Sequence, residues 1–89
     1  MNTLEAYVDQ MNRWNAIFKS PAVNFPLTQQ DVEDLSNKLG SELSPENLHC
    51  DGEISPAQAR KKYNYLMTVQ AQLETYCAKN ALTFKEPIY

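Results

Sequence analysis

The sequence predicts an all-α fold, a small three-helix bundle with a long C-terminal helix. Apolar residues recur at steps of three and four in segments at about residues 3–19, 28–39 and 56–79, and this spacing gathers side chains on one face of a helix. Hydrophobic residues make up 43% and aromatic residues 10% of the 89 residues, which is enough apolar material for a core. We therefore expect residues 1–89 to form a single helical domain.

The first helix is expected at residues 3–19. Asn2 or Thr3 can cap its start, and Ser20 ends it because a residue before proline avoids helical geometry. Its apolar face consists of Leu4, Tyr7, Val8, Met11, Trp14, Ile17 and Phe18. Residues 20–27 contain two prolines among apolar residues, so we expect this connection to pack onto the core without forming a helix.

The second helix is expected at residues 28–39. Thr28 and Asp31 form an N-terminal capping pattern, and Gly40 stands where a helix commonly ends. Its narrow apolar stripe consists of Val32, Leu35 and Leu39. A Ser-Pro pair then repeats a helix-start pattern and predicts a single helical turn at 44–48.

The third helix is expected at residues 56–79. Ser55 and Gln58 form a capping box around Pro56, a residue favoured at the first helical position. The apolar residues fill a broad arc, whose centre consists of Ala59, Tyr63, Leu66, Met67, Leu73 and Cys77. A helix that serves only one small core needs a narrower stripe, so part of this arc is predicted to be available for other contacts.

One margin of this arc is the predicted partner-binding surface. Exposed aromatic side chains beside polar and basic groups are typical of protein interfaces, because they give a large contact area. The predicted surface, with two residues from an extended C-terminal tail, consists of Lys61, Tyr65, Val69, Gln72, Tyr76, Lys79, Phe84 and Tyr89. An equally weighted alternative is that the tail or the segment around Phe25 covers this margin within one chain.

Residues 47–58 resemble the loop of a helix-loop-helix calcium site. Gly52 is placed as in that loop, whose ligands occupy positions 1, 3, 5, 7, 9 and 12. Those positions hold Asn47, His49, Asp51, Glu53, Ser55 and Gln58. A Gln replaces the closing Glu, and Asp51 is the only carboxylate in a side-chain ligand position, so poor calcium binding is expected and the capping role of Ser55 is favoured. A cation-responsive module built on this loop is kept as an alternative.

No catalytic residue, metal site or cofactor is predicted. Catalysis needs a convergent nucleophile, base and set of oxyanion donors, whereas the chain has a single His and no glycine-rich loop. His49 and Cys50 are neighbours in a loop and are not expected to face each other. The paired spacings typical of zinc ligands are absent from the sequence. We therefore expect the protein not to be an enzyme.

Arg60, Lys61 and Lys62, followed by Tyr63 and Tyr65, are the only local cluster of basic and aromatic residues. Such clusters can contact phosphates while the rings stack on bases. Consecutive helical residues point about 100° apart, however, and the net charge of -3 also disfavours nucleic-acid binding. Weak nucleic-acid binding through the three basic residues is kept as an alternative.

These features predict a small non-catalytic protein-protein interaction module. The chain is short, helical and without a catalytic set, and in this general character it is similar to small accessory proteins of bacteriophages and mobile elements. That similarity implies that it inhibits or redirects a host protein and acts in the host cytoplasm, while a second copy of the chain is another candidate partner. No segment approaches the roughly 18 to 20 apolar residues of a membrane span, and no secretory signal is recognisable, so a cytoplasmic protein without membrane contact is expected.

Overall fold

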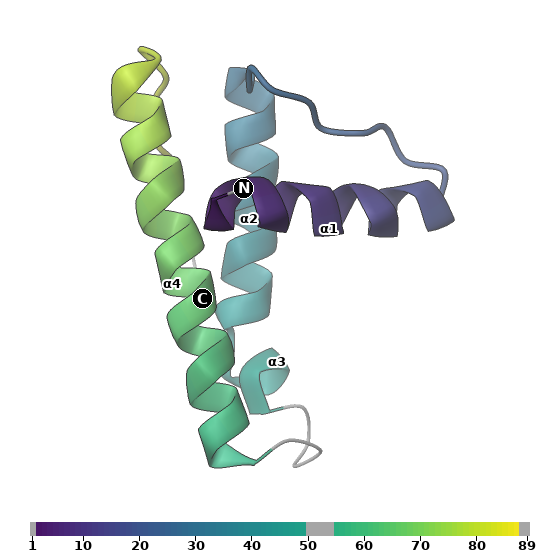
Figure 1. Ribbon diagram of the computed structural model, residues 1–89, viewed down its shortest axis with the longest axis vertical. Coiled ribbons are helices and arrows are strands. Elements are labelled where there is room, and N and C mark those ends of the chain that lie inside the picture. Colours follow the sequence, from purple (N-terminus) through teal and green to yellow (C-terminus); the bar gives the residue numbers. More distant parts are fainter. Residues whose placement is uncertain (1, 50–54, 88–89) are drawn as a thin grey trace.

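The computed structural model describes residues 2–49 and 55–87 and confirms the predicted all-α bundle. Within these residues the chain forms helices α1 (Thr3–Ile17), α2 (Gln29–Leu43), α3 (Pro45–His49) and α4 (Pro56–Lys79), with no strands. α2 and α4 lie side by side and antiparallel, α1 lies across this pair, and α3 sits at the lower end of the bundle (Figure 1). Among the described helices, none combines the length and the apolar character that a membrane crossing requires.

The helix starts follow the capping patterns in the sequence. The Asn2 side chain accepts a hydrogen bond from the first turn of α1. Thr28 and Asp31 form a reciprocal capping box at α2, and Ser55 and Gln58 form one at α4. Each cap satisfies backbone amides that have no partner inside the helix, so these three starts are fixed locally.

Two helix ends differ from the prediction. α1 ends at Ile17, and Lys19, which was expected to be helical, has φ 55° and turns the chain away. α2 continues through Gly40 to Leu43. A glycine inside a helix costs about 1 kcal/mol, but Leu43 lies four residues after Leu39 on the same face and is buried with it. This burial of a leucine, worth about 1.5–3 kcal/mol, offsets the cost of the glycine.

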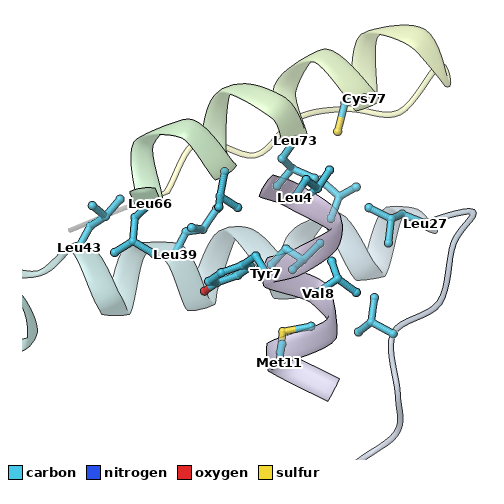
Figure 2. Close-up of a cluster of buried hydrophobic side chains, with 14 residues drawn as sticks. Leu4, Tyr7, Val8, Met11, Leu27, Leu39, Leu43, Leu66, Leu73 and Cys77 are labelled. Carbon is cyan, nitrogen blue, oxygen red and sulfur yellow. The ribbon is translucent and has the colours of Figure 1, made fainter. Parts of the chain in front are cut away.

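The core lies where α1 crosses the α2–α4 pair. Figure 2 shows Leu4 of α1 beside Leu73 of α4, and the Tyr7 ring of α1 extending toward Leu39 of α2. The largest fully buried side chains all come from the crossed pair and include Leu35, Leu39, Leu43, Leu66 and Leu73. α1 therefore covers one face of the leucine-rich layer that α2 and α4 form.

The connection between α1 and α2 packs onto the core, as predicted. Val23 and Leu27 are buried. The side-chain amide of Asn12 in α1 donates to the Val23 carbonyl and accepts from the Val23 N–H, both at 2.7 Å. The Leu27 N–H donates to the hydroxyl of Tyr76 at 2.9 Å. These bonds hold a proline-containing segment against two helices.

The C-terminal tail returns along α2. The Gln29 side chain donates to the Thr83 carbonyl at 2.8 Å and accepts from the Thr83 N–H at 2.9 Å. Farther along, the Lys85 ammonium donates to the Asn37 side chain at 3.0 Å. Phe84 lies between these two contacts and packs against the core. The tail therefore docks on the chain's own bundle.

We predict that Phe84→Ala lowers the free energy of unfolding by about 2 kcal/mol, because it removes a half-buried aromatic ring from the core edge. Urea denaturation followed by circular dichroism measures the change. The matched control is Lys85→Ala, which removes one exposed contact and should cost less than about 0.5 kcal/mol. Equal stability of the two variants would contradict docking of the tail.

Candidate functional site

Part of the partner-binding surface predicted on α4 is covered by the chain itself, since Val69 is buried and Gln72 and Tyr76 are half-buried. Val69 has an exposed fraction of 0%, so its assignment to a surface is wrong. The Gln72 side-chain oxygen accepts the Leu4 N–H at 2.6 Å. The Tyr76 ring meets the Phe25 ring edge-on, with centroids 5.7 Å apart. The margin of α4 is thus covered by α1 and by the connection that contains Phe25.

The remaining residues of that predicted surface do not form one site. Phe84 packs against the core through the tail, and Tyr89 lies outside the described residues. Lys61 and Lys79 are exposed, but at 1.5 Å per residue they stand about 27 Å apart along α4. Among the described residues of the predicted set, Tyr65, 36% exposed, is the one aromatic ring with substantial access to solvent. The structure shows intramolecular cover, one of the two alternatives, for Val69, Gln72 and Tyr76.

A different apolar surface lies at the C-terminal end of α1. Trp14, Ile17 and Phe18 have exposed fractions of 56%, 71% and 61%, and we call these three residues the α1 tip. The Trp14 and Phe18 rings contact each other at a centroid distance of 4.9 Å. In Figure 1 this end of α1 extends past α2 and is followed by the connection to α2. The α1 tip is the largest group of neighbouring exposed apolar side chains among the described residues.

The α1 tip is exposed because α1 is longer than the layer it crosses. The buried residues Leu4, Tyr7, Val8 and Met11 occupy its first half. Trp14 and Phe18 follow Met11 by three and seven residues on the same stripe, in the half of α1 that extends past α2 (Figure 1). A 15-residue helix is about 22 Å long, so a helix laid across two others extends beyond their edge. The sequence periodicity could not reveal this, because the buried and the exposed half have the same spacing.

A cleft of about 430 Å³ lies between the second half of α1 and α2. Its apolar wall comes from Met11 and from Trp14 and Ile17 of the α1 tip, and Lys38 and Glu42 of α2 form its polar wall. Arg13 lies at its rim and forms an exposed ion pair with Asp9 at 3.0 Å. Within the described residues, Lys38 has no ion-pair partner. An apolar side chain flanked by polar groups would fit this cleft.

Tyr7 closes the inner end of the cleft. Its hydroxyl donates to a Glu42 carboxylate oxygen at 2.6 Å, and its ring lies 6.3 Å from that of Tyr65. Burial, reinforced by the bond to Glu42, raises the pKa of Tyr7 far above its ordinary value. Burial also raises the pKa of Tyr65, with a contribution from the Glu42 charge. Both phenols are therefore neutral at physiological pH and act as structural groups.

The thiol of Cys77 is also unreactive. Cys77 is free and buried in the core on α4. Burial, with a smaller contribution from the Glu74 charge, raises its pKa. Reactive cysteines require the opposite shift, because the thiolate is the nucleophile.

The calcium-like loop is described only at its ends. The Gln58 side-chain oxygen accepts the Ser55 N–H at 3.2 Å, so it serves the helix cap and not a ligand position. Residues 50–54, which include Asp51 and Glu53, lie outside the described part of the chain. The cation-responsive module therefore stays a prediction. Elsewhere, the described residues contain no group of three His, Cys, Asp or Glu side chains placed to hold a metal ion.

The basic cluster at the start of α4 is spread around the helix. Arg60 and Lys61 are exposed, whereas the half-buried Lys62 donates to the Asn47 carbonyl at 3.5 Å. Tyr63, which was expected to face the core, is 40% exposed. That expectation is wrong because the buried stripe of α4 consists of Ala59, Leu66, Val69, Leu73 and Cys77. The cluster does not form one continuous face.

Comparisons with models of known families, with curated proteins and with solved structures give no match to this chain. The candidate site therefore rests on the chain's own geometry.

We predict that Tyr7→Phe lowers the free energy of unfolding at pH 7 by about 1–2 kcal/mol, because a hydrogen bond to a charged acceptor is lost. The raised pKa of Tyr7 means that the unfolded chain ionises first as pH rises past about 10. The contribution of Tyr7 to the free energy of unfolding is thus fully present below that pH. Above it, this contribution falls by up to about 1.4 kcal/mol per pH unit.

The stability gap between wild type and Tyr7→Phe should therefore shrink between about pH 10 and 11. Urea denaturation at pH 7, 10 and 11 measures this gap. Tyr63→Phe, which changes an exposed ring, is the control and should match wild type at pH 7. A gap for Tyr7→Phe that is constant over this pH range would contradict selective protonation of Tyr7 in the folded state.

Proposed function

We propose that the protein is a small non-catalytic interaction module that binds another protein through the α1 tip and the adjacent cleft. The observation that carries this proposal is the grouping of Trp14, Ile17 and Phe18, each more than half exposed, beside a cleft of about 430 Å³. Exposed apolar patches of this kind, rimmed by polar residues, mark protein interaction sites. The rim here consists of Gln10, Arg13, Lys38 and Glu42.

The composition of the tip suits a binding hot spot. Trp is among the residues that carry most binding energy at interfaces, and aromatic rings lose little rotamer freedom on binding. The contact between Trp14 and Phe18 restricts both rings before any partner arrives. Such preorganisation lowers the entropic cost of association. The aromatic rings of the α1 tip are therefore held in place before a partner binds.

The electrostatics support a non-catalytic role. The groups with shifted pKa values, Tyr7, Tyr65 and Cys77, are all shifted toward the protonated, neutral form. A nucleophile or general base would need to be held in its reactive form near neutral pH. Within the described residues, these shifts keep all three groups neutral and do not prepare a reaction.

The proposed activity is control of a partner by occupying its surface. In an accessory protein of a phage or mobile element, the partner would be a host protein that is inhibited or redirected. A module of this size can do so because binding alone blocks or recruits a surface. Nucleic-acid binding through Arg60, Lys61 and Lys62 is less well supported, since Lys62 is engaged with α3.

We predict that replacing Trp14 and Phe18 together by Ser weakens partner binding by at least about 30-fold, which corresponds to the loss of one hot spot of about 2 kcal/mol. The partner is obtained by capture on the wild-type protein in lysate of its native cells, and affinities are then measured by calorimetry with purified components. Because both side chains are mostly exposed, we expect unfolding free energies within about 1 kcal/mol of wild type.

The control for this experiment is Tyr63→Ser, which removes an aromatic ring of 40% exposure on α4, away from the tip. Its affinity should equal that of wild type. If the captured partner binds the Trp14 and Phe18 double variant as tightly as wild type, the α1 tip is not the binding surface.

A further inference from the structure

Lys38, on the polar wall of the cleft, is half-buried. Two carboxylates of α2, Asp34 and Glu42, lie four residues before and after it, at the spacing that allows ion pairs. Both are bonded elsewhere: Asp34 accepts from the Gln30 side chain at 3.0 Å, and Glu42 accepts from the Tyr7 hydroxyl at 2.6 Å. Among the described residues, neither forms an ion pair with Lys38. The positive charge of Lys38 is therefore not neutralised by this part of the chain.

A partner that fills the cleft brings this charge further out of water. Trp14 and Ile17 stand on the apolar wall of the same cleft, so an apolar side chain that packs on them also covers the Lys38 ammonium. Burying a charge without a partner is costly. A carboxylate that arrives with the apolar side chain removes this cost, because it forms a charge-assisted hydrogen bond with the ammonium. The cleft therefore favours a carboxylate next to an apolar group.

Arg13 adds a second cation at the rim of the cleft. One of its guanidinium nitrogens bonds to Asp9 at 3.0 Å, and its side chain is 81% exposed. A guanidinium has five N–H donors, so donors remain for a carboxylate of a partner. Among the residues that line the cleft, Arg13 and Lys38 are cations and Glu42 is the one carboxylate. The charge of this lining is thus complementary to an acidic partner.

A second cleft beside α1 has the opposite charge. It has a volume of about 350 Å³ and lies between α1, the 20–27 connection and the start of α2. Its charged lining residues are Asp31 and Asp34, and among the described residues no Lys or Arg lines it. An acidic partner is repelled there. The acidic group of a partner is therefore directed to the cleft that holds Lys38.

We infer that the α1 tip and the cleft beside it bind an acidic amphipathic helix of a partner protein. This inference rests on the proposed function, because it names the kind of partner for the same surface. Trp14, Ile17 and Phe18 are spaced i, i+3 and i+4 and form an exposed ridge on α1, and such ridges pack into the grooves of another helix. Apolar residues of the partner helix cover this ridge, and a Glu or Asp beside its apolar stripe pairs with Lys38.

Three synthetic peptides test this inference on the full chain. Each has about 15 residues, enough for a helix, with blocked ends and a stripe of Leu at helical spacing. The positions beside the stripe carry Glu in the first peptide, Gln in the second and Lys in the third. Circular dichroism checks that the three have comparable helix content.

Trp14 reports binding at the tip directly. It is the only Trp in the chain and the peptides contain none, so its emission should shift to the blue as a peptide covers the ring. An isolated helix covers only this surface, and we expect a dissociation constant on the order of 0.1 mM for the Glu peptide. The Lys peptide should bind at least about tenfold more weakly, and the Gln peptide should lie between them.

Lys38→Glu tests the pairing. This variant should prefer the Lys peptide over the Glu peptide, because the charge that faces the partner is reversed. Lys61→Glu makes the same change of net charge on the exposed surface of α4, and it should keep the preference of wild type within about twofold. The reversal compares two peptides on one variant, so a loss of stability in that variant does not produce it.

Equal affinity of the wild-type chain for all three peptides would overturn the acidic partner, yet would leave the α1 tip as a binding surface. A preference for the Glu peptide that persists in Lys38→Glu would overturn the pairing with Lys38. Trp14 emission that no peptide shifts at about 1 mM, well above the expected dissociation constant, would overturn the helix as the occupant. The proposed function is decided separately, by the affinity of the captured native partner for the Trp14 and Phe18 double variant.

Discussion

The position of α1 across the α2–α4 pair is the constraint on which the rest of the structure depends. A helix that lies along its neighbours can bury its whole apolar stripe, whereas a helix that lies across them buries only the part above the pair. Here Leu4, Tyr7, Val8 and Met11 are buried and Trp14 and Phe18 are exposed. Both the core and the candidate site are thus parts of a single stripe on one helix.

Polar contacts fix α1 in this crossed position. The Leu4 N–H, one of the amides without a partner inside the helix, is satisfied by Gln72 of α4. The Tyr7 hydroxyl reaches Glu42 of α2, so α1 is bonded to both helices of the layer. Hydrophobic burial alone has no direction. These contacts therefore determine where along α1 the core ends and where the exposed tip begins.

The sequence predicted local structure well because the signals are local. Three caps, the single turn of α3 and the packing of the 20–27 connection follow from residues close together in the chain. The partner-binding surface predicted on α4 was partly wrong for the opposite reason, because the exposure of a side chain depends on segments that are distant in the chain. Periodicity assigns residues to a helical face but does not say which neighbour covers that face. Tyr76 contacts Phe25 and Leu27, about 50 residues away in the chain, which only the tertiary arrangement reveals.

The exposed tip has no role in the core that would account for its composition. The Trp14–Phe18 contact, spaced i and i+4, stabilises an isolated helix by about 0.2–0.5 kcal/mol, and this is a structural reason for two aromatic rings. It does not explain Ile17, the most exposed of the three at 71%, because a polar residue there would keep the helix and lower the tendency to aggregate. Apolar side chains that bury little area within their own fold bury more area when a partner surface covers them. The physical advantage of this arrangement therefore lies in binding.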